Sequence, residues 1–186
     1  SARNDLEITE TDPEEGFDDF MALYRGMLAR KGFFDSSAIA TLPALMQATV
    51  GVLRPKIFLV SHKGVPTAGA VIDFSGNRAV YLYGATDERA LGLKAGYAMH
   101  WWIAEHLSRD PDIRWYDLGG KDGDGGLHQF KKGFVGKCGA IIPTPPSYEF
   151  AVNWKGRALG RTIFALRDAK ARVDHLLYKA ESVLRS

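Results

Sequence analysis

The spacing of apolar residues predicts two helices in the first 50 residues of the chain. After a helix start signal at Asp12-Pro13, apolar residues recur at three- and four-residue spacing as far as Gly32, where the first helix should end. The residues of this stripe are Phe17, Phe20, Met21, Tyr24 and Leu28. A second helix is expected from Ser36 or Ser37. Pro43 should bend or restart that helix, because proline has no amide hydrogen to donate to the preceding turn.

Alternating or β-branched segments next predict strands. Tight-turn signals at His62-Lys63-Gly64 and Ser75-Gly76-Asn77 separate three of them, which indicates an antiparallel meander with two hairpins. Gly69, inside the middle strand, is expected to mark a β-bulge. A short edge strand should precede the first helix. The four predicted strands are 6–9, 56–61, 66–74 and 78–85.

Beyond the meander the pattern predicts a crossover. Residues 94–107 have helical periodicity, and residues 114–118 have the aromatic bias of a strand. A connection this long implies that strands 78–85 and 114–118 pair in parallel. Segments 139–142 and 148–152 are expected to add a last strand or two. The predicted fold class is therefore α/β, of the α+β type, with a mixed and mostly antiparallel sheet flanked by helices.

The tail, residues 157–185, reads as one long amphipathic helix with a basic face. Its basic residues are Arg157, Arg161, Arg167, Lys170, Arg172, Lys179 and Arg185. This composition is most often that of a packed helix with a solvated face, which is the preferred interpretation. The alternatives are a helix that lies on a membrane surface or on a partner.

Composition excludes several classes of protein. A chain of 186 residues with one cysteine, Cys138, is expected to be a single domain without disulfides. A net charge of +2 excludes strong steering of the whole chain toward nucleic acid. The sequence has no signal peptide pattern and no apolar run long enough for a membrane span, so a cytoplasmic protein is expected, and the abrupt start suggests a fragment of a longer one.

The candidate chemistry lies between Arg114 and Val135. A strand at 114–118, ended by Gly119 and Gly120, leads into a glycine-rich loop at 121–126, and a basic, aromatic helix follows at 127–134. Glycines leave backbone amides uncovered, and a lysine beside an aromatic residue at a helix start could hold an anion or a developing oxyanion. The alternative is a solvated loop with surface lysines. No metal site is expected, because the five histidines are scattered and Asp122 and Asp124 lack further calcium ligands.

The order of elements resembles that of GNAT-type acyltransferases. In that fold the pyrophosphate of the acyl donor binds a loop that begins with Arg or Gln and carries two small residues. Here the matching segment is Arg89-Ala90-Leu91-Gly92-Leu93-Lys94, which places Lys94 where a small residue is needed. That departure argues against ordinary use of acetyl-coenzyme A.

Four motifs in order are closer to the Fem family of aminoacyl-tRNA-dependent peptidyl transferases. They are Tyr81-Leu82-Tyr83-Gly84-Ala85-Thr86, Trp102, Tyr116-Asp117-Leu118-Gly119-Gly120, and Gly126-Leu127 with Phe130-Lys131-Lys132-Gly133-Phe134. Arg30-Lys31-Gly32-Phe33 also resembles the Arg-containing segment at the end of the family's first helix. Fem proteins look like two GNAT domains in tandem, and this chain is similar to the second domain from Asp12 through Phe150.

The resemblance implies a site and a reaction. Arg30 would contact phosphate of a nucleotide-linked or lipid-linked muropeptide acceptor, and the catalytic pair Phe130 and Lys131 would lie where an aminoacyl ester meets the acceptor amine. A cation placed at the developing oxyanion can lower the barrier by about 3 kcal/mol or more. The remaining expected substrate-binding residues are Tyr83, Tyr116, Asp117, Gly119 and Gly120.

The expected partners are an aminoacyl-tRNA donor, for which the basic tail helix is a candidate surface, and an absent N-terminal GNAT domain. No cofactor is expected for this reaction. Two alternatives stay open: an N-acyltransferase that uses an acyl-coenzyme A or acyl-carrier thioester, and a non-catalytic domain that binds a nucleotide sugar or a peptide.

Overall fold

The computed structural model describes residues 5–32, 38–48, 51, 54–120, 126–143 and 150–184, and it divides into two compact units. The first unit comprises Ser1–Lys31 and Ser37–Gly139, and the second comprises Gly32–Ser36 and Ala140–Ser186. That the whole chain forms one acyltransferase domain stays a prediction.

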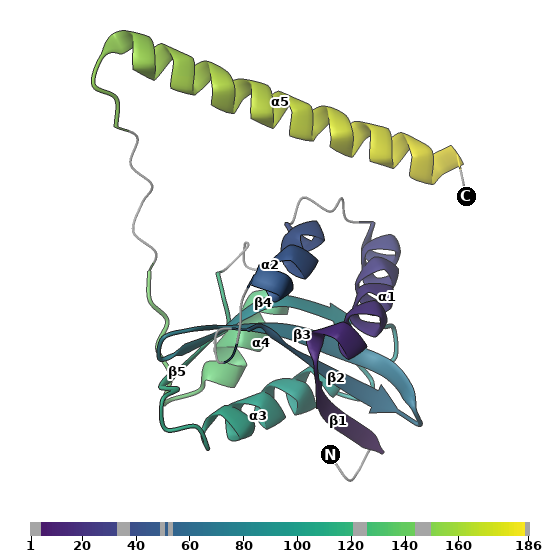
Figure 1. Ribbon diagram of the computed structural model, residues 1–186. Helices are drawn as coiled ribbons and strands as arrows, with labels where there is room; N and C mark the ends of the chain where they lie inside the picture. The colour runs from purple at the N-terminus through teal and green to yellow at the C-terminus, as the bar shows by residue number, and fades with distance from the viewer. Residues whose placement is uncertain are drawn as a thin grey trace. The chain divides into compact units, whose positions relative to one another are not determined.

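The first unit is built on a five-stranded sheet in the order β1-β2-β3-β4-β5 (Figure 1). Neighbouring strands are antiparallel except β4 and β5, which are parallel. The strands are β1 Leu6–Thr11, β2 Lys56–His62, β3 Val65–Ser75, β4 Arg78–Thr86 and β5 Trp115–Asp117. The sequence-based expectation of a mixed, mostly antiparallel sheet with a parallel crossover to the last strand is confirmed.

Both predicted hairpins are present, and their turns explain why. Lys63 and Gly64 connect β2 to β3 with φ angles of 52° and 76°. A two-residue hairpin turn of type I′ requires positive φ at both of these positions. Gly76, with φ of 60°, begins the turn between β3 and β4. Turn chemistry thus fixes the meander locally.

The helices form a layer on each face of the sheet (Figure 1). On one face, Phe20 and Tyr24 of α1 pack with Leu42 and Met46 of α2. On the other face, Met99 and further residues of α3 cover β2 to β4. The elements are α1 Pro13–Lys31, the 3₁₀ turn η1 Ile39–Thr41, α2 Leu42–Ala48, α3 Ala95–Leu107 and α4 Gly126–Val135.

The second predicted helix is present in altered form. Its expected start at Ser36 or Ser37 lies outside the described residues. From Ile39 the backbone makes a 3₁₀ turn and restarts as α2 at Leu42, directly before Pro43. This arrangement agrees with the expected effect of Pro43, which the first turn of a helix tolerates.

An extra residue in β4 divides its tyrosines between the two faces of the sheet. Val71 pairs with Tyr83, but the next residue, Ile72, pairs with Tyr81, so Leu82 is the inserted residue of a bulge. Side chains alternate along a strand, and the insertion shifts this alternation by one. Tyr83 therefore packs with the α1 layer, and Tyr81 packs with the α3 layer.

The expectation of a bulge at Gly69 is wrong. The ladder runs regularly through Gly69, which pairs with Leu59 and Ala85, and its irregularities lie at Val60/Ser61 and Val71/Ile72. Position 69 requires glycine because neighbouring side chains pack closely against it. A β carbon at position 69 would lie 3.0 Å from the ring of Phe20 and 3.1 Å from Leu59.

The expected last strand is absent from the described residues of the second unit. Residues 140–143 and 150–153 are irregular, and the rest of the predicted strand at 148–152 lies outside the described part of the chain. Ile142 is 75% exposed, and Pro143 has no amide hydrogen for a ladder. The predicted tail helix is confirmed as α5, Trp154–Leu184, and the Asn153 side chain caps it by accepting a hydrogen bond from the Gly156 amide.

The bulge makes Gly84 a test of this packing. Gly84 faces the same side as Tyr81, and a β carbon at position 84 would overlap the Tyr81 hydroxyl. We expect Gly84→Ala to lower the free energy of unfolding by about 1–3 kcal/mol, as overpacking does. Gly26→Ala is the control, because it has open space in α1 and should stabilise by about 0.5–1 kcal/mol. Urea denaturation measures the free energy of unfolding of both variants, and equal changes would contradict the packing of Gly84 against Tyr81.

Candidate functional site

The site begins where β4 and β5 part. Their ladder joins Arg78–Val80 to Trp115–Asp117, and β4 then continues to Thr86 paired with β3 but no longer with β5. Asp117 stabilises the turn that follows, because its carboxylate accepts a hydrogen bond of 2.8 Å from the Gly119 amide. Gly119 has φ of 73°, a left-handed backbone angle that favours glycine.

Lys131, on α4, reaches this turn. Its Nζ atom donates a hydrogen bond of 2.7 Å to the carbonyl oxygen of Gly120. A β carbon at position 119 would lie 3.9 Å from the same Nζ and 3.5 Å from the carbonyl oxygen of Tyr81. The ammonium group is thus held at the point where the two parallel strands separate.

An aromatic cluster lies beside Lys131 and is centred on His100 of α3. The His100 ring is 4.7 Å from that of Tyr81, 5.2 Å from that of Phe130 and 5.7 Å from that of Phe134, measured between centroids. Its Nδ1 atom makes a hydrogen bond of 2.7 Å with the hydroxyl of Tyr116. His100 therefore joins α3, β5 and α4.

Burial keeps His100 uncharged. The residue is 3% exposed, and this desolvation, together with the nearby positive charge of Lys131, lowers the pKa of His100 to about 4. Burial also raises the pKa of Tyr81 to about 12 and raises the pKa of Tyr116, the latter with a contribution from Tyr81. At neutral pH the cluster is thus a neutral hydrogen-bonded pair of His100 and Tyr116 next to one cation.

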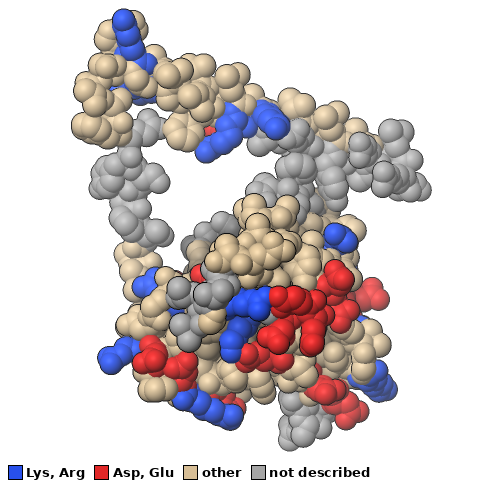
Figure 2. All heavy atoms as spheres, in the orientation of Figure 1, with Lys and Arg blue, Asp and Glu red and all other residues tan. Residues whose placement is uncertain are grey.

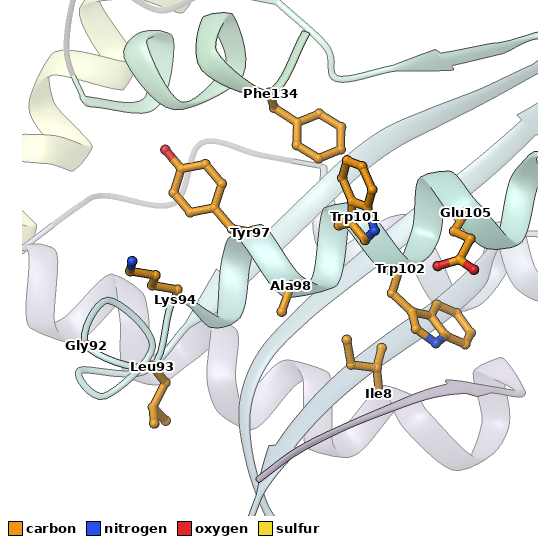
Figure 3. Close-up of a pocket in the computed structure, with 10 residues that line it drawn as sticks. All are labelled: Ile8, Gly92, Leu93, Lys94, Tyr97, Ala98, Trp101, Trp102, Glu105 and Phe134. Carbon is orange, nitrogen blue, oxygen red and sulfur yellow. The ribbon is translucent and has the colours of Figure 1, made fainter. Parts of the chain in front are cut away.

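A groove of about 720 Å³ runs along the outer side of α3 (Figure 3). Its aromatic walls come from Tyr97 and the 69% exposed Trp101 on α3, and from Phe134 on α4. The Tyr97 ring also lies 4.6 Å from that of Phe130, which connects the groove to the Lys131 region. The other lining residues are Ile8, Gly92, Leu93, Lys94, Ala98, Trp102 and Glu105.

The loop between β4 and α3 is folded around a carboxylate of its own. Asp87 Oδ1 accepts hydrogen bonds from the amides of Arg89 and Ala90, at 2.9 and 3.0 Å, and one of 2.5 Å from the Thr67 hydroxyl. The Arg89 side chain donates to Asp87 Oδ2 at 2.6 Å. Burial by itself would raise the pKa of Asp87, but the hydrogen bonds from Thr67 and Arg89 bring it below its usual value.

Three further amides of this loop donate within it. Leu93 donates to the carbonyl oxygen of Arg89, Lys94 to that of Leu91 and Ala95 to that of Ala90. Lys94 itself has φ of 54°, a left-handed conformation that a small residue adopts more easily. The segment in which the sequence suggested a donor-binding loop therefore uses several of its amides internally.

The structure groups the expected site residues on two faces of the sheet. Phe130, Lys131, Tyr116, Asp117, Gly119 and Gly120 lie together at the separated strand ends. Arg30 and Tyr83 belong to the other face. The Tyr83 ring packs 6.4 Å from that of Tyr24, and Arg30 donates a hydrogen bond of 2.7 Å to the carbonyl oxygen of Thr86 at the end of β4. Phe33, Asp122 and Asp124 lie outside the described residues.

Sequence reasoning missed His100, Tyr97 and Tyr81 as members of the site. A sequence signal for His100 existed, because Ile103 and Leu107 follow it at i+3 and i+7 and share its buried helix face. Tyr81 had no such signal, since its side depends on the bulge at Leu82. No group of three or more potential metal ligands occurs among the described residues. None of the helices searched in that part of the chain is long and apolar enough to cross a membrane.

A parallel β4–β5 pair that separates beside a helix, within a mostly antiparallel sheet, defines the class of acyltransferases to which the chain belongs. The match to a family gives the same result: the chain belongs to the acetyltransferase (GNAT) domain family, over residues 2–132. The protein is thus a GNAT-fold acyltransferase, and α5 lies outside the matched region.

Solved structures of several acyltransferases share this fold. An aminoglycoside acetyltransferase from an uncultured soil metagenomic sample, in complex with sisomicin, has a TM-score of 0.58 at 11% identity. The match covers 81% of this chain and 100% of the acetyltransferase. FemX has a TM-score of 0.57 at 17% identity, over 72% of this chain and 50% of its own. A ribosomal-protein-alanine N-acetyltransferase from Brucella melitensis has a TM-score of 0.53 at 8% identity, over 80% of this chain and 99% of its own.

At these identities the likeness shows the fold alone. No curated protein matches the sequence significantly. The chain spans half the length of FemX.

The buried histidine predicts a dependence of stability on pH. The folded-state pKa of His100, about 4, is below the usual 6.5, so the unfolded chain takes up the proton first as the pH falls. Stability from this group is present above pH 6.5 and is lost between pH 6.5 and 4, by about 3 kcal/mol. We expect His100→Gln to flatten the urea-unfolding free energy over this range relative to the parent. Parallel curves for the two proteins would contradict the burial of a neutral His100.

Proposed function

We propose that the protein transfers an aminoacyl group from aminoacyl-tRNA to an amine of a peptidoglycan precursor, as a Fem-type member of the GNAT acyltransferases. The observation that carries this choice of donor is the carboxylate of Asp87, which accepts hydrogen bonds from the amides of Arg89 and Ala90. The likeness of the fold to FemX is consistent with the proposal.

The choice of donor depends on what the loop before α3 can bind. A diphosphate at this loop would need amide donors and a positive field. Here Asp87 takes two amides and the Arg89 side chain, and three more amides bond within the loop. A diphosphate would therefore find five amides of the loop already bonded and would be repelled by the Asp87 carboxylate. A donor that carries its acyl group on a ribose hydroxyl avoids this cost.

The reaction needs charge stabilisation more than covalent chemistry. The nitrogen of the acceptor amine attacks the ester carbonyl carbon, and negative charge develops on the carbonyl oxygen. The C–O bond to the ribose hydroxyl then breaks, the amide forms, and the proton released by the amine ends on that hydroxyl. Lys131, held near Gly119 and Gly120, is the cation proposed for the developing oxyanion.

Phe130 has a supporting role in this proposal. Its ring packs on Tyr97 and His100, which fixes the start of α4 and thereby the next residue, Lys131. The groove lined by Trp101 and Phe134 would accept an apolar or planar part of a substrate. Arg30 and Tyr83, on the other face of the sheet, would contact the acceptor only around the end of β4.

The donor can be tested without knowledge of the acceptor. A ligand with a dissociation constant of 10 µM, added at 1 mM, would stabilise the fold by about 2.7 kcal/mol and raise the melting temperature by roughly 5–10 °C. We expect 1 mM acetyl-coenzyme A to leave the melting temperature unchanged within about 1 °C. A shift of several degrees in a thermal melt would instead favour a thioester donor and overturn the proposal.

Lys131 and its neighbour provide a matched pair for the catalytic role. Lys131 bonds to Gly120 at the strand ends, whereas Lys132 is exposed on α4. We expect Lys131→Ala to lower kcat for aminoacyl transfer by about 100-fold or more, the effect of losing one oxyanion donor. Lys132→Ala should stay within about threefold of the parent. Single-turnover transfer from aminoacyl-tRNA to a muropeptide amine measures both, and equal rates would remove Lys131 from the mechanism.

A further inference from the structure

The tail helix α5 has a broad apolar face that its own unit does not cover. Beyond Trp154, seven of its large apolar side chains in the described part of the chain are between 47% and 65% exposed. They are Leu159, Ile163, Phe164, Leu166, Val173, Leu176 and Leu177. At about 100° per residue, most of them fall with the helix alanines in a sector roughly 120° wide. That sector is broader than the narrow seam of a two-stranded coiled coil.

Charge is divided between α5 and the rest of the chain. Residues 154–184 contain seven Lys and Arg against three Asp and Glu, a net charge of +4, which leaves the other residues at −2 of the chain's total of +2. In Figure 2, Lys and Arg predominate on the visible face of α5, whereas Asp and Glu gather on part of the first unit. A surface that complements this helix would therefore be both apolar and anionic.

The basic residues are placed at the edges of the apolar sector. By helical spacing, Arg161 and Arg172 lie along one edge and Lys170 along the other, while Arg157 and Arg167 lie on the polar face. Arg167 is also bonded to the carboxylate of the neighbouring Asp168. Basic side chains at the edge of an apolar face can extend toward headgroups while their stems remain in contact with apolar surface.

Exposed apolar residues continue into the segment that leads to the helix. Among the described residues, Ile141, Ile142, Phe150, Val152 and Trp154 are all more than 60% exposed. Tryptophan next to an apolar helix face is typical of the membrane interface, where one side of the ring is apolar and the other is hydrated.

Among the described residues of the first unit, the exposed aromatic residues Tyr97 and Trp101 share their groove with one carboxylate, Glu105, which is already paired with Arg109. Glu14 and Glu15 are on α1, across the sheet. An anionic bilayer presents negative charge and hydrocarbon at the same place. We propose that α5 docks in the interface of membranes with anionic headgroups, its Leu166–Leu177 face toward the acyl chains and its edge arginines on the headgroups.

The experiment is flotation of the full chain with vesicles of neutral lipid or with 30% phosphatidylglycerol. We expect binding to the anionic vesicles only, with a decrease at high salt. Arg161→Gln with Arg172→Gln should weaken binding about 30-fold, whereas the matched polar-face pair Arg157→Gln with Arg167→Gln should weaken it less than about threefold. Leu166→Gln with Leu177→Gln should weaken it about tenfold or more.

Three results would overturn the proposal: no flotation, equal flotation with neutral vesicles, and equal losses for the two arginine pairs. Light scattering tests whether a second copy of the chain covers the apolar face instead. A stable dimer of the parent that Leu166→Gln with Leu177→Gln dissociates, without flotation of either protein, would mean that a second copy covers the face. The melting temperature of the first unit should be the same in all variants, since none of the changes falls within it.

Discussion

The hydrogen bond between His100 and Tyr116 joins the elements between which the site is built. It connects α3 to β5 at 2.7 Å, in a place where both groups are largely withdrawn from water. A buried imidazole and a buried hydroxyl each need a partner, so the pair fixes the position of α3 relative to the last strand. Phe130 and Phe134 of α4 then pack against the imidazole ring, and this contact positions Lys131 beside Gly120.

The same arrangement depends on two local irregularities in β4 and its continuation. The bulge at Leu82 turns Tyr81 toward His100 and leaves Tyr83 on the opposite face. Asp87 then organises the loop before α3 by accepting bonds from its amides. Under the proposed function, this carboxylate disfavours a diphosphate donor at the loop, whereas the hydrogen bond of Lys131 to Gly120 does not involve the loop.

The two units differ in what stabilises them. The first has a helix layer on each face of its sheet, with cores formed around Phe58 and Phe20. The second consists mainly of α5, whose large apolar residues are exposed among the described residues of that unit. Because an amphipathic helix gains most of its stability from what its apolar face contacts, a surface that covers this face would stabilise α5.

The sequence by itself determined the elements and their order, because turn residues, capping residues and periodicity act locally. Lys63-Gly64 set the first hairpin, Asp12-Pro13 the start of α1, and the length of the crossover the parallel pairing of β5. It also located Phe130 and Lys131 in one segment with Gly119 and Gly120. Only the tertiary structure decided which face each of these residues occupies. His100, Tyr81 and Asp87 contribute through contacts with residues distant in the chain. A single inserted residue in β4 placed Tyr81 and Tyr83 on opposite faces of the sheet, an outcome that no local pattern contains.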